Sequence, residues 1–135
     1  MFDTKIAIVV RDDLAAWQKL NITAFLASGI AAAAPEAIGE PYVDAGGHAY
    51  GRMFVQPVLV FRGPLAGLQA AHRQALERGL TILPYVEAMF ATGHDAANRA
   101  VFAEEDPAAL NLVGLAIRGP KKAVDKTVKG LSLHD

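Results

Sequence analysis

The chain has 135 residues, a formal net charge of -1 and no cysteine, while hydrophobic residues make up 53% of it. A nearly neutral chain has no global field that attracts nucleic acid or an anionic membrane, and without cysteine it has no disulfide, thiolate nucleophile or zinc–thiolate site. The hydrophobic share exceeds the ~45–50% of ordinary soluble domains and favours a buried interface such as that of a homodimer.

The first half of the chain predicts a strand, a long helix and an insert. Lys5–Val10 is a β-branched run typical of a strand buried on both faces. Asp13 stands where it would cap the helical region from about 14 to 34, which forms one long helix or two short ones, with Gly29 as its weak point. Between 38 and 56, the turn Asp44–His48 separates two short extended runs, which predicts a hairpin-like insert at the edge of the sheet.

The second half continues the alternation of strands and helices. The internal Pro84 predicts that its strand has an edge position or a bulge. The order of elements indicates one α/β domain over residues 1–135, a three-layer α/β/α fold around a central mixed, mainly parallel sheet of about four strands. The further strands are expected at 57–61, 81–86 and 111–117, and the further helices at 65–78, 95–103 and 121 to about 130.

Motifs of several common chemistries are missing from the sequence. No strand is followed by Gly-x-Gly-x-x-Gly or a P-loop, so we expect no nucleotide cofactor, and no Gly-x-Ser-x-Gly elbow indicates a serine hydrolase. No histidine or carboxylate cluster has metal-ligand spacing, so no metal site is expected. His72 is interpreted as a partly buried structural side chain and His94 as a helix cap. The opening residues lack a signal-peptide pattern and no apolar run could cross a bilayer, which favours a cytoplasmic protein without a membrane partner.

Charged residues follow the predicted strands. Ligands of open α/β sheets bind at the carboxyl ends of the strands, so Arg11–Asp13, Arg62 and Glu87 are expected to frame a pocket, joined by Arg118 if its strand runs parallel. Arg62 suits a carboxylate or phosphate ligand, and the alternative is that it pairs with surface acids. Asp13 and Glu87 are the candidate general bases.

The first helix and the insert supply further candidates. Trp17 and Asn21 lie on one face of the helix, and Lys19 and Thr23 share another. An asparagine among aromatic residues on a packing face either binds a ligand or satisfies a backbone group. His48 in the Gly-rich turn has either a binding or a purely local role. Trp17, Asn21, Thr23, Arg62 and His48 are therefore the candidate ligand-binding residues.

The order of these segments resembles the type 2 peptidyl-tRNA hydrolases, and more closely a set of uncharacterised bacterial proteins related to them. The resemblance rests on KIAIVVRDDL at 5–14, the helix start at Lys19, the strand–helix–strand at 58–86, and LVGLAIRGPKKAVDKTVKGLSL at 112–133. It implies the same fold and catalytic positions for Lys19 and Glu87. The family's glutamine is replaced by Thr23, and its Asp-Ala-Gly-Arg-Thr stretch falls at 87–91, where its aspartate is Glu87.

Two functions of different classes remain open. The favoured one is a small-ligand or partner-binding domain with a partly apolar pocket, because polar groups that the resembling family uses on the ester are missing. The alternative is a divergent hydrolase of peptidyl-tRNA or a related ester or amide, in which Lys19 holds a developing negative charge and Glu87 or Asp13 acts as base. Transfer RNA would contact residues 118–135, where five basic side chains outnumber two acidic ones. The net charge of the whole chain gives no support to such a partner.

Overall fold

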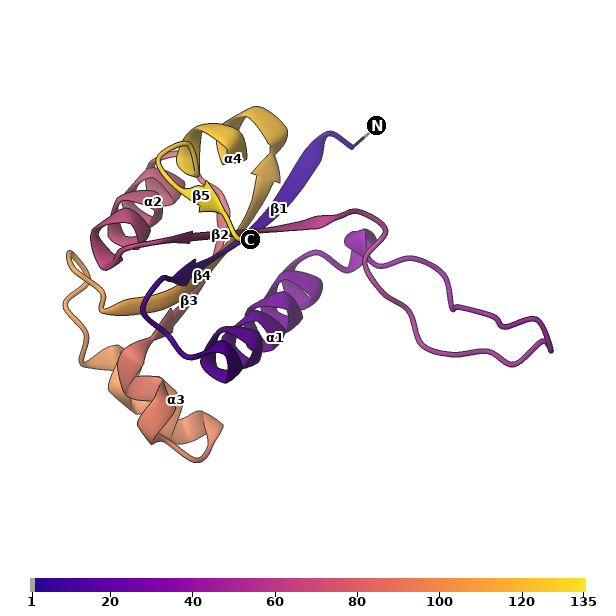
Figure 1. Ribbon diagram of the computed structural model, residues 1–135, viewed down its shortest axis with the longest axis horizontal. Coiled ribbons are helices and arrows are strands. Elements are labelled where there is room, and N and C mark those ends of the chain that lie inside the picture. The colour runs from indigo at the N-terminus through magenta and orange to yellow at the C-terminus, as the bar shows by residue number, and fades with distance from the viewer. Residues whose placement is uncertain (1) are drawn as a thin grey trace.

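The structure is a computed structural model that describes residues 2–135, in which five strands form one mixed sheet of order β3-β4-β1-β2-β5 (Figure 1). The strands are β1 (Thr4–Arg11), β2 (Val58–Gly63), β3 (Thr81–Val86), β4 (Leu112–Pro120) and β5 (Ser132–Leu133). The α-helices are α1 (Ala16–Ala33), α2 (Leu65–Glu77), α3 (Asp95–Ala103) and α4 (Lys121–Thr127), and the 3-10 helices are η1 (Pro35–Ala37) and η2 (Glu87–Ala91).

The strand directions show that the prediction of a mainly parallel sheet of about four strands is wrong. Within residues 2–135, β1 and β2 form the parallel pair, whereas β4 is antiparallel to both β1 and β3, and β5 is antiparallel to β2. The chain returns from β3 through η2 and α3 to the neighbouring β4 without a helix crossing the sheet, so these strands run in opposite directions. The two-residue β5 is too short to show a strand period in the sequence.

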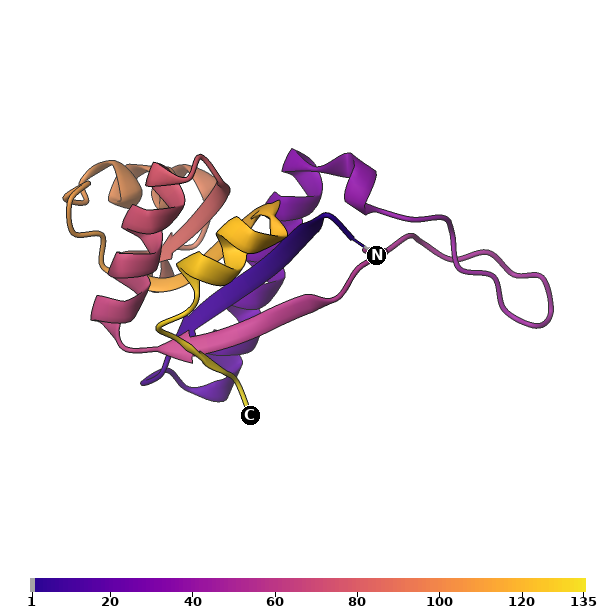
Figure 2. The same ribbon diagram turned by 90° about the horizontal axis from the view of Figure 1, so that it is seen from above.

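Helices cover both faces of the sheet, as the prediction of a three-layer α/β/α arrangement requires (Figure 2). Ile22 and Ile30 of α1 pack with the even-numbered side chains of Ile6–Val10. Leu68 of α2 and Val124 of α4 pack on the opposite face, with the odd-numbered side chains of the same strand. Both faces of β1 are thus buried, which explains its unbroken apolar sequence.

Pro84 in β3 and Gly29 in α1 shape the region where this helix and this strand meet. Pro84 lies in β3 at the sheet edge, and the pairing of β3 with β4 shifts register between Tyr85 and Val86, which confirms the expected edge position and irregularity. A Cβ atom at Gly29 would lie 2.5 Å from Cγ of Leu83. Gly29 is therefore no break in α1; it allows the helix to approach β3 closely.

The start of α1 differs from the prediction. The helix begins at Ala16, and Ala15 occupies the cap position, where its backbone N–H donates to the side-chain oxygen of Gln18 at 3.0 Å. Asp13 stands two residues before this cap and accepts a hydrogen bond from Arg11 instead. The N-cap role predicted for Asp13 is therefore wrong, because the arginine competes successfully for its carboxylate.

Residues 38–56, which we call the arm, form an extended two-stranded excursion that projects away from the body of the molecule (Figures 1 and 2). Antiparallel bridges join its two sides at the root and near the tip, which confirms the hairpin-like insert. The arm leaves η1 beyond the C-terminal end of α1 and runs directly into β2, so it projects from the body and does not pair with a strand of the sheet. No helix among residues 2–135 has the length and apolar character that spanning a membrane requires.

Candidate functional site

A charged cluster surrounds Arg11 at the carboxyl end of β1. The Arg11 side chain is 10% exposed, and its Nε donates to Asp13 at 2.6 Å. Its two terminal nitrogens donate to Glu87 at 3.0 Å and to Asn111 at 3.3 Å. The second carboxylate oxygen of Glu87 accepts from the Asn111 amide at 2.9 Å. These four side chains, the Arg11 cluster, satisfy one another and line a hollow of about 490 Å³.

The same contacts set the protonation of the two carboxylates. The hydrogen bond from Arg11 holds the pKa of Asp13 below its ordinary value. Hydrogen bonds from Asn111 and then Arg11 lower the pKa of Glu87. A carboxylate is a weaker general base the lower its pKa, so the cluster favours charge pairing over proton abstraction at neutral pH.

Basic side chains line the neighbouring rim, formed by α1, β2 and the C-terminal residues. Nζ of Lys19 lies 3.1 Å from Nε2 of His134, which the pairing of β5 with β2 brings to this edge. Arg62 donates to Asp12 at 3.2 Å and lies 3.6 Å from the carboxylate of Asp135. Arg62 thus pairs with surface acids, as the alternative interpretation of this arginine expected.

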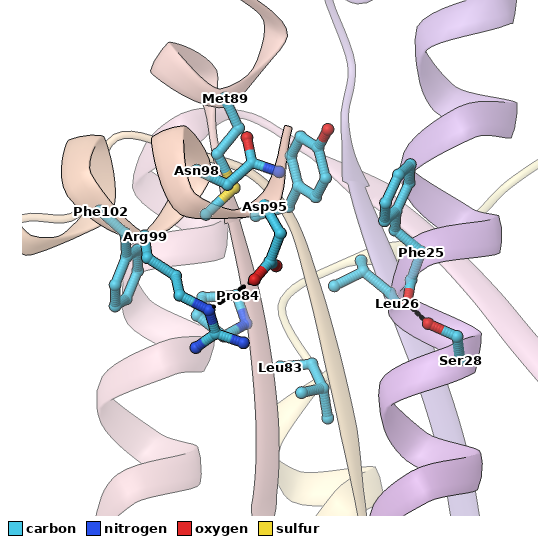
Figure 3. Close-up of a pocket in the computed structure, with 11 residues that line it drawn as sticks. Phe25, Leu26, Ser28, Leu83, Pro84, Met89, Asp95, Asn98, Arg99 and Phe102 are labelled. Carbon is cyan, nitrogen blue, oxygen red and sulfur yellow. Dashed lines mark hydrogen bonds and ion pairs between the residues drawn. The ribbon is translucent and has the colours of Figure 1, made fainter. Parts of the chain in front are cut away.

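An open groove of about 580 Å³ lies between α1, β3 and α3, and we call it the aromatic groove (Figure 3). Its walls are mainly apolar, with polar groups from α1 and α3 at the rim. The apolar lining consists of Phe25, Leu26, Leu83, Pro84, Tyr85, Met89 and Phe102, and the polar lining of Ser28, Asp95, Asn98 and Arg99.

Aromatic rings follow one another along one side of this groove. Phe25 lies 5.8 Å from Tyr85, Tyr85 lies 5.6 Å from Phe90, and Phe90 lies 6.1 Å from Trp17, measured between ring centroids. Trp17 is 63% exposed and Phe25 is 53% exposed, although both rings belong to this packed series. Burial raises the pKa of the Tyr85 hydroxyl. The groove therefore presents aromatic surface to solvent beside the buried ring of Tyr85.

The structure brings two of the candidate ligand-binding residues to the groove. Trp17 and Asn21 line a hollow of about 270 Å³ that continues it toward η2. Thr23 is on the same helix, but its hydroxyl donates to the backbone carbonyl of Lys19 at 2.6 Å. His48 lies on the arm, where its ring contacts that of Tyr50 at a centroid distance of 4.7 Å. Neither Thr23 nor His48 lines the groove.

The structure also shows the places of His94, His72 and Arg118. His94 caps α3, because its Nδ1 accepts from the backbone N–H of Ala97 at 3.2 Å. His72 is partly buried, and burial together with the charge of Arg73 lowers its pKa. Arg118 lies at the opposite end of the sheet, 3.5 Å from Glu36, because β4 runs antiparallel to β1.

Sequence reasoning missed the α3 side of the groove. Asn98, Arg99 and Phe102 belong to α3, whose range agrees with the helix expected at 95–103, but none of these three residues was a candidate for the site. The alternation of small apolar and polar residues after Asp95 is the signal that could have placed one face of this helix against β3. Among residues 2–135, no three His, Asp or Glu side chains group in a way that could hold a metal ion.

The fold and the groove define a class of protein: a three-layer α/β protein with a mixed five-stranded sheet in the part of the chain that the structure describes, and an open aromatic cleft at its β3 edge. The chain belongs to DUF2000, a family of proteins of unknown function whose model matches residues 4–135.

A solved structure of a protein of unknown function from Agrobacterium tumefaciens strain C58 is very similar. The two chains are 52% identical, the match covers 100% of each, and the TM-score is 0.97. No curated protein matches the chain. None of these findings relates the chain to the peptidyl-tRNA hydrolases, so that resemblance is not confirmed.

Proposed function

We propose that this chain is a binding protein for a small amphipathic molecule, an aromatic acid, which it holds in the aromatic groove. The observation that carries the proposal is the packed series of rings from Phe25 through Tyr85 to Phe90, with Phe25 half exposed, beside a hollow of about 580 Å³. Ligand pockets commonly measure ~300–1,000 Å³ and combine apolar walls with a few polar groups.

The rim of the groove supports the acidic part of the ligand. Arg99 pairs with Asp95 at 2.8 Å, and both side chains are more than three-quarters exposed. Exposed pairs of this kind within one helix contribute little to stability, so Arg99 can exchange its partner for a ligand carboxylate at small cost. The guanidinium binds a carboxylate with two parallel hydrogen bonds, while the ligand ring packs between Phe25 and Phe102.

The experiment uses Trp17, the sole tryptophan of the sequence, as an optical reporter beside the groove. Titration with 8-anilinonaphthalene-1-sulfonate and with naphthoic acid should give saturable changes in fluorescence. Because a half-exposed phenylalanine contributes on the order of 1.4 kcal/mol of contact, Phe25→Ala should weaken binding about tenfold.

The matched control is Leu76→Ala, which removes a similarly exposed apolar side chain from α2 on the other face of the sheet. It should leave the affinity unchanged. Equal weakening by both variants, or a signal that does not saturate, would contradict binding in the groove. An affinity for naphthoic acid that Arg99→Ala leaves intact would contradict the acidic part of the ligand.

A second candidate function follows from the neighbouring rim. Lys19, His134 and the Arg11 cluster place basic and acidic groups at the carboxyl ends of β1 and β3, which is where a divergent hydrolase of peptidyl-tRNA or a related ester would act. Both oxygens of Glu87 are engaged and its pKa is lowered, which favours the binding protein. Release of the amino acid from N-blocked aminoacyl-tRNA, abolished in Lys19→Ala, would favour the hydrolase.

A further inference from the structure

The arm and the outer face of α1 together carry most of the apolar surface that the molecule exposes. Of the eleven large hydrophobic side chains exposed among residues 2–135, eight lie on these two segments. On α1 they are Trp17, Leu20 and Phe25, and on the arm they are Tyr42, Val43, Tyr50, Met53 and Val55. A cluster of this kind marks a surface that another molecule covers.

The arm has little to hold it on its own body. All residues from 40 to 53 are exposed, and a two-stranded ribbon alone in water is marginally stable at best. The arm also has few charges, because Glu40, Asp44 and Arg52 are its charged residues. Its ordered, extended form is therefore expected to depend on packing against a second surface.

Helix α1 is mainly apolar beyond its first turns, which contain Gln18, Lys19 and Asn21. Residues 23–33 include no charged side chain, and the helix buries Ile22, Leu26 and Ile30 against the sheet. Leu20 and Ala24 lie on a side of the helix that faces solvent, so α1 exposes apolar side chains there. An apolar helix face of this kind is normally covered.

We propose that the chain forms a two-fold homodimer in which the arm of each copy lies along the outer face of α1 of the other. The arm and α1 have nearly the same length. From residue 38 to residue 46 the arm extends about 26 Å, and the 18 residues of α1 extend about 27 Å. The arm leaves the body beyond the C-terminal end of α1 and projects away from it (Figure 2), where a second copy can cover it. In the proposed dimer the root of the arm lies at the C-terminal end of the partner's α1 and its tip at the start of that helix.

The charges agree with this direction. The tip of the arm carries Asp44, whose carboxylate accepts hydrogen bonds from Gly46, His48 and the Tyr50 hydroxyl and remains exposed. The start of α1 has the positive end of the helix dipole, no acidic residue in its first turn, and Lys19. The negative tip of one arm thus reaches the positive end of the partner's α1.

The contact has the area that an interface needs. A ribbon about 26 Å long and about 10 Å wide, packed on a helix in both halves of a two-fold dimer, buries on the order of 1,000 Å² in total. That is the lower limit for a specific interface. The arrangement is isologous and closed, so it ends at two copies. Trp17 and Phe25 also border the aromatic groove and its continuation, so the arm is placed over the side of α1 that carries Leu20 and Ala24, and the dimer does not depend on the ligand proposed for the groove.

Sedimentation of the full chain at 10–50 µM tests the assembly and its surfaces (about the range in which a weak dimer is populated). The expected mass is twice the monomer's 14.3 kDa. Met53→Glu on the arm and Ala24→Glu on α1 each bury a charge in the proposed contact, and each should shift the protein to monomer. Leu76→Glu, at a similarly exposed site on α2, should remain dimeric. A monomeric wild type, or a dimer that both glutamate variants leave intact, would overturn the proposal.

A cross-link tests the direction of the arm, and the cysteine-free sequence makes it specific. Ala45→Cys at the tip and Ala16→Cys at the start of α1 are prepared separately, mixed and oxidised. The mixture should give a disulfide-linked pair of the two variants, whereas Ala45→Cys mixed with Ala66→Cys on α2 should not. Equal cross-linking in both mixtures would reject this placement of the arm, and growth into higher oligomers would reject the closed dimer.

Discussion

The Arg11 cluster and the aromatic groove lie side by side, since η2 starts at Glu87 and continues into the groove at Met89, yet they are built in opposite ways. In the cluster, Arg11, Asp13, Glu87 and Asn111 satisfy one another's hydrogen bonds. In the groove, aromatic rings such as Phe25 remain half exposed. Charged residues at a strand end can thus serve the fold, while the surface proposed to bind a ligand is the part that the fold leaves uncovered.

The largest effect on stability is expected from Arg11→Ala. It removes a side chain that is 10% exposed and leaves the amide of Asn111 and two carboxylates without their shared partner, which should lower the free energy of unfolding by about 2–3 kcal/mol. Urea denaturation measures this loss. Arg62→Ala, at a side chain 41% exposed, is the control and should cost less than about 1 kcal/mol. Equal costs would show that the cluster is no more structural than the surface.

Gly29→Val should affect stability and binding together. Its Cβ would meet Leu83, so the helix must move or Leu83 must shift, at a cost of about 1–2 kcal/mol. Leu83 lines the groove, and probe affinity should therefore fall as well. Ala32→Val, at an exposed position of α1, separates the effect of β-branching from that of the contact. A variant with full affinity would show that the spacing of α1 and β3 does not shape the groove.

A pH titration tests how much Glu87 of the Arg11 cluster contributes to stability. The pKa of Glu87 is lower in the folded chain than its ordinary value of 4.5, so its contribution to stability is present above that pH and is lost as the pH falls through the folded pKa. The urea midpoint should fall below pH 4.5 in the wild type and fall less in Glu87→Gln. Identical profiles would mean that Glu87 is not stabilised by its partners in solution.

The smallest effect on stability is expected from Phe25→Ala, the variant that should weaken binding of the proposed ligand. Phe25 is 53% exposed, so its removal should lower the free energy of unfolding by less than about 1 kcal/mol. Thermal denaturation in the absence of ligand measures this. A loss as large as that of Arg11→Ala would make Phe25 part of the core and would remove the contrast between the two regions.

The sequence predicted those parts of the fold that depend on local pattern. The β-branched run before Arg11, the helical region between 14 and 34, and the cap at His94 all follow from neighbouring residues, although whether Gly29 divides that region did not. Strand direction does not, because nothing in the residues of β4 indicates that it pairs antiparallel with both neighbours. The N-cap prediction at Asp13 failed for the same reason, since its partner Arg11 prevails over the helix end only in the folded chain.

The candidate site residues show the same difference between what local pattern predicts and what depends on long-range packing. The strand-end rule brought Arg11, Asp13 and Glu87 together, and Asn111 joins them because β4 starts where β1 ends. Trp17 and Asn21 reached the groove because they share a helix face. The opposite wall required knowledge of where α3 packs, which depends on contacts between segments distant in sequence.

Pro84 has a consequence for the behaviour of the protein at high concentration. It lies within β3, the outermost strand on one side of the sheet, and proline offers no backbone N–H to a further strand. The irregular pairing at Tyr85 and Val86 and the turn into η2 shorten the regular edge still more. Fibril growth by edge-to-edge strand addition is therefore disfavoured at this side, so a chain rich in apolar residues can reach high concentrations without cross-β aggregation starting there.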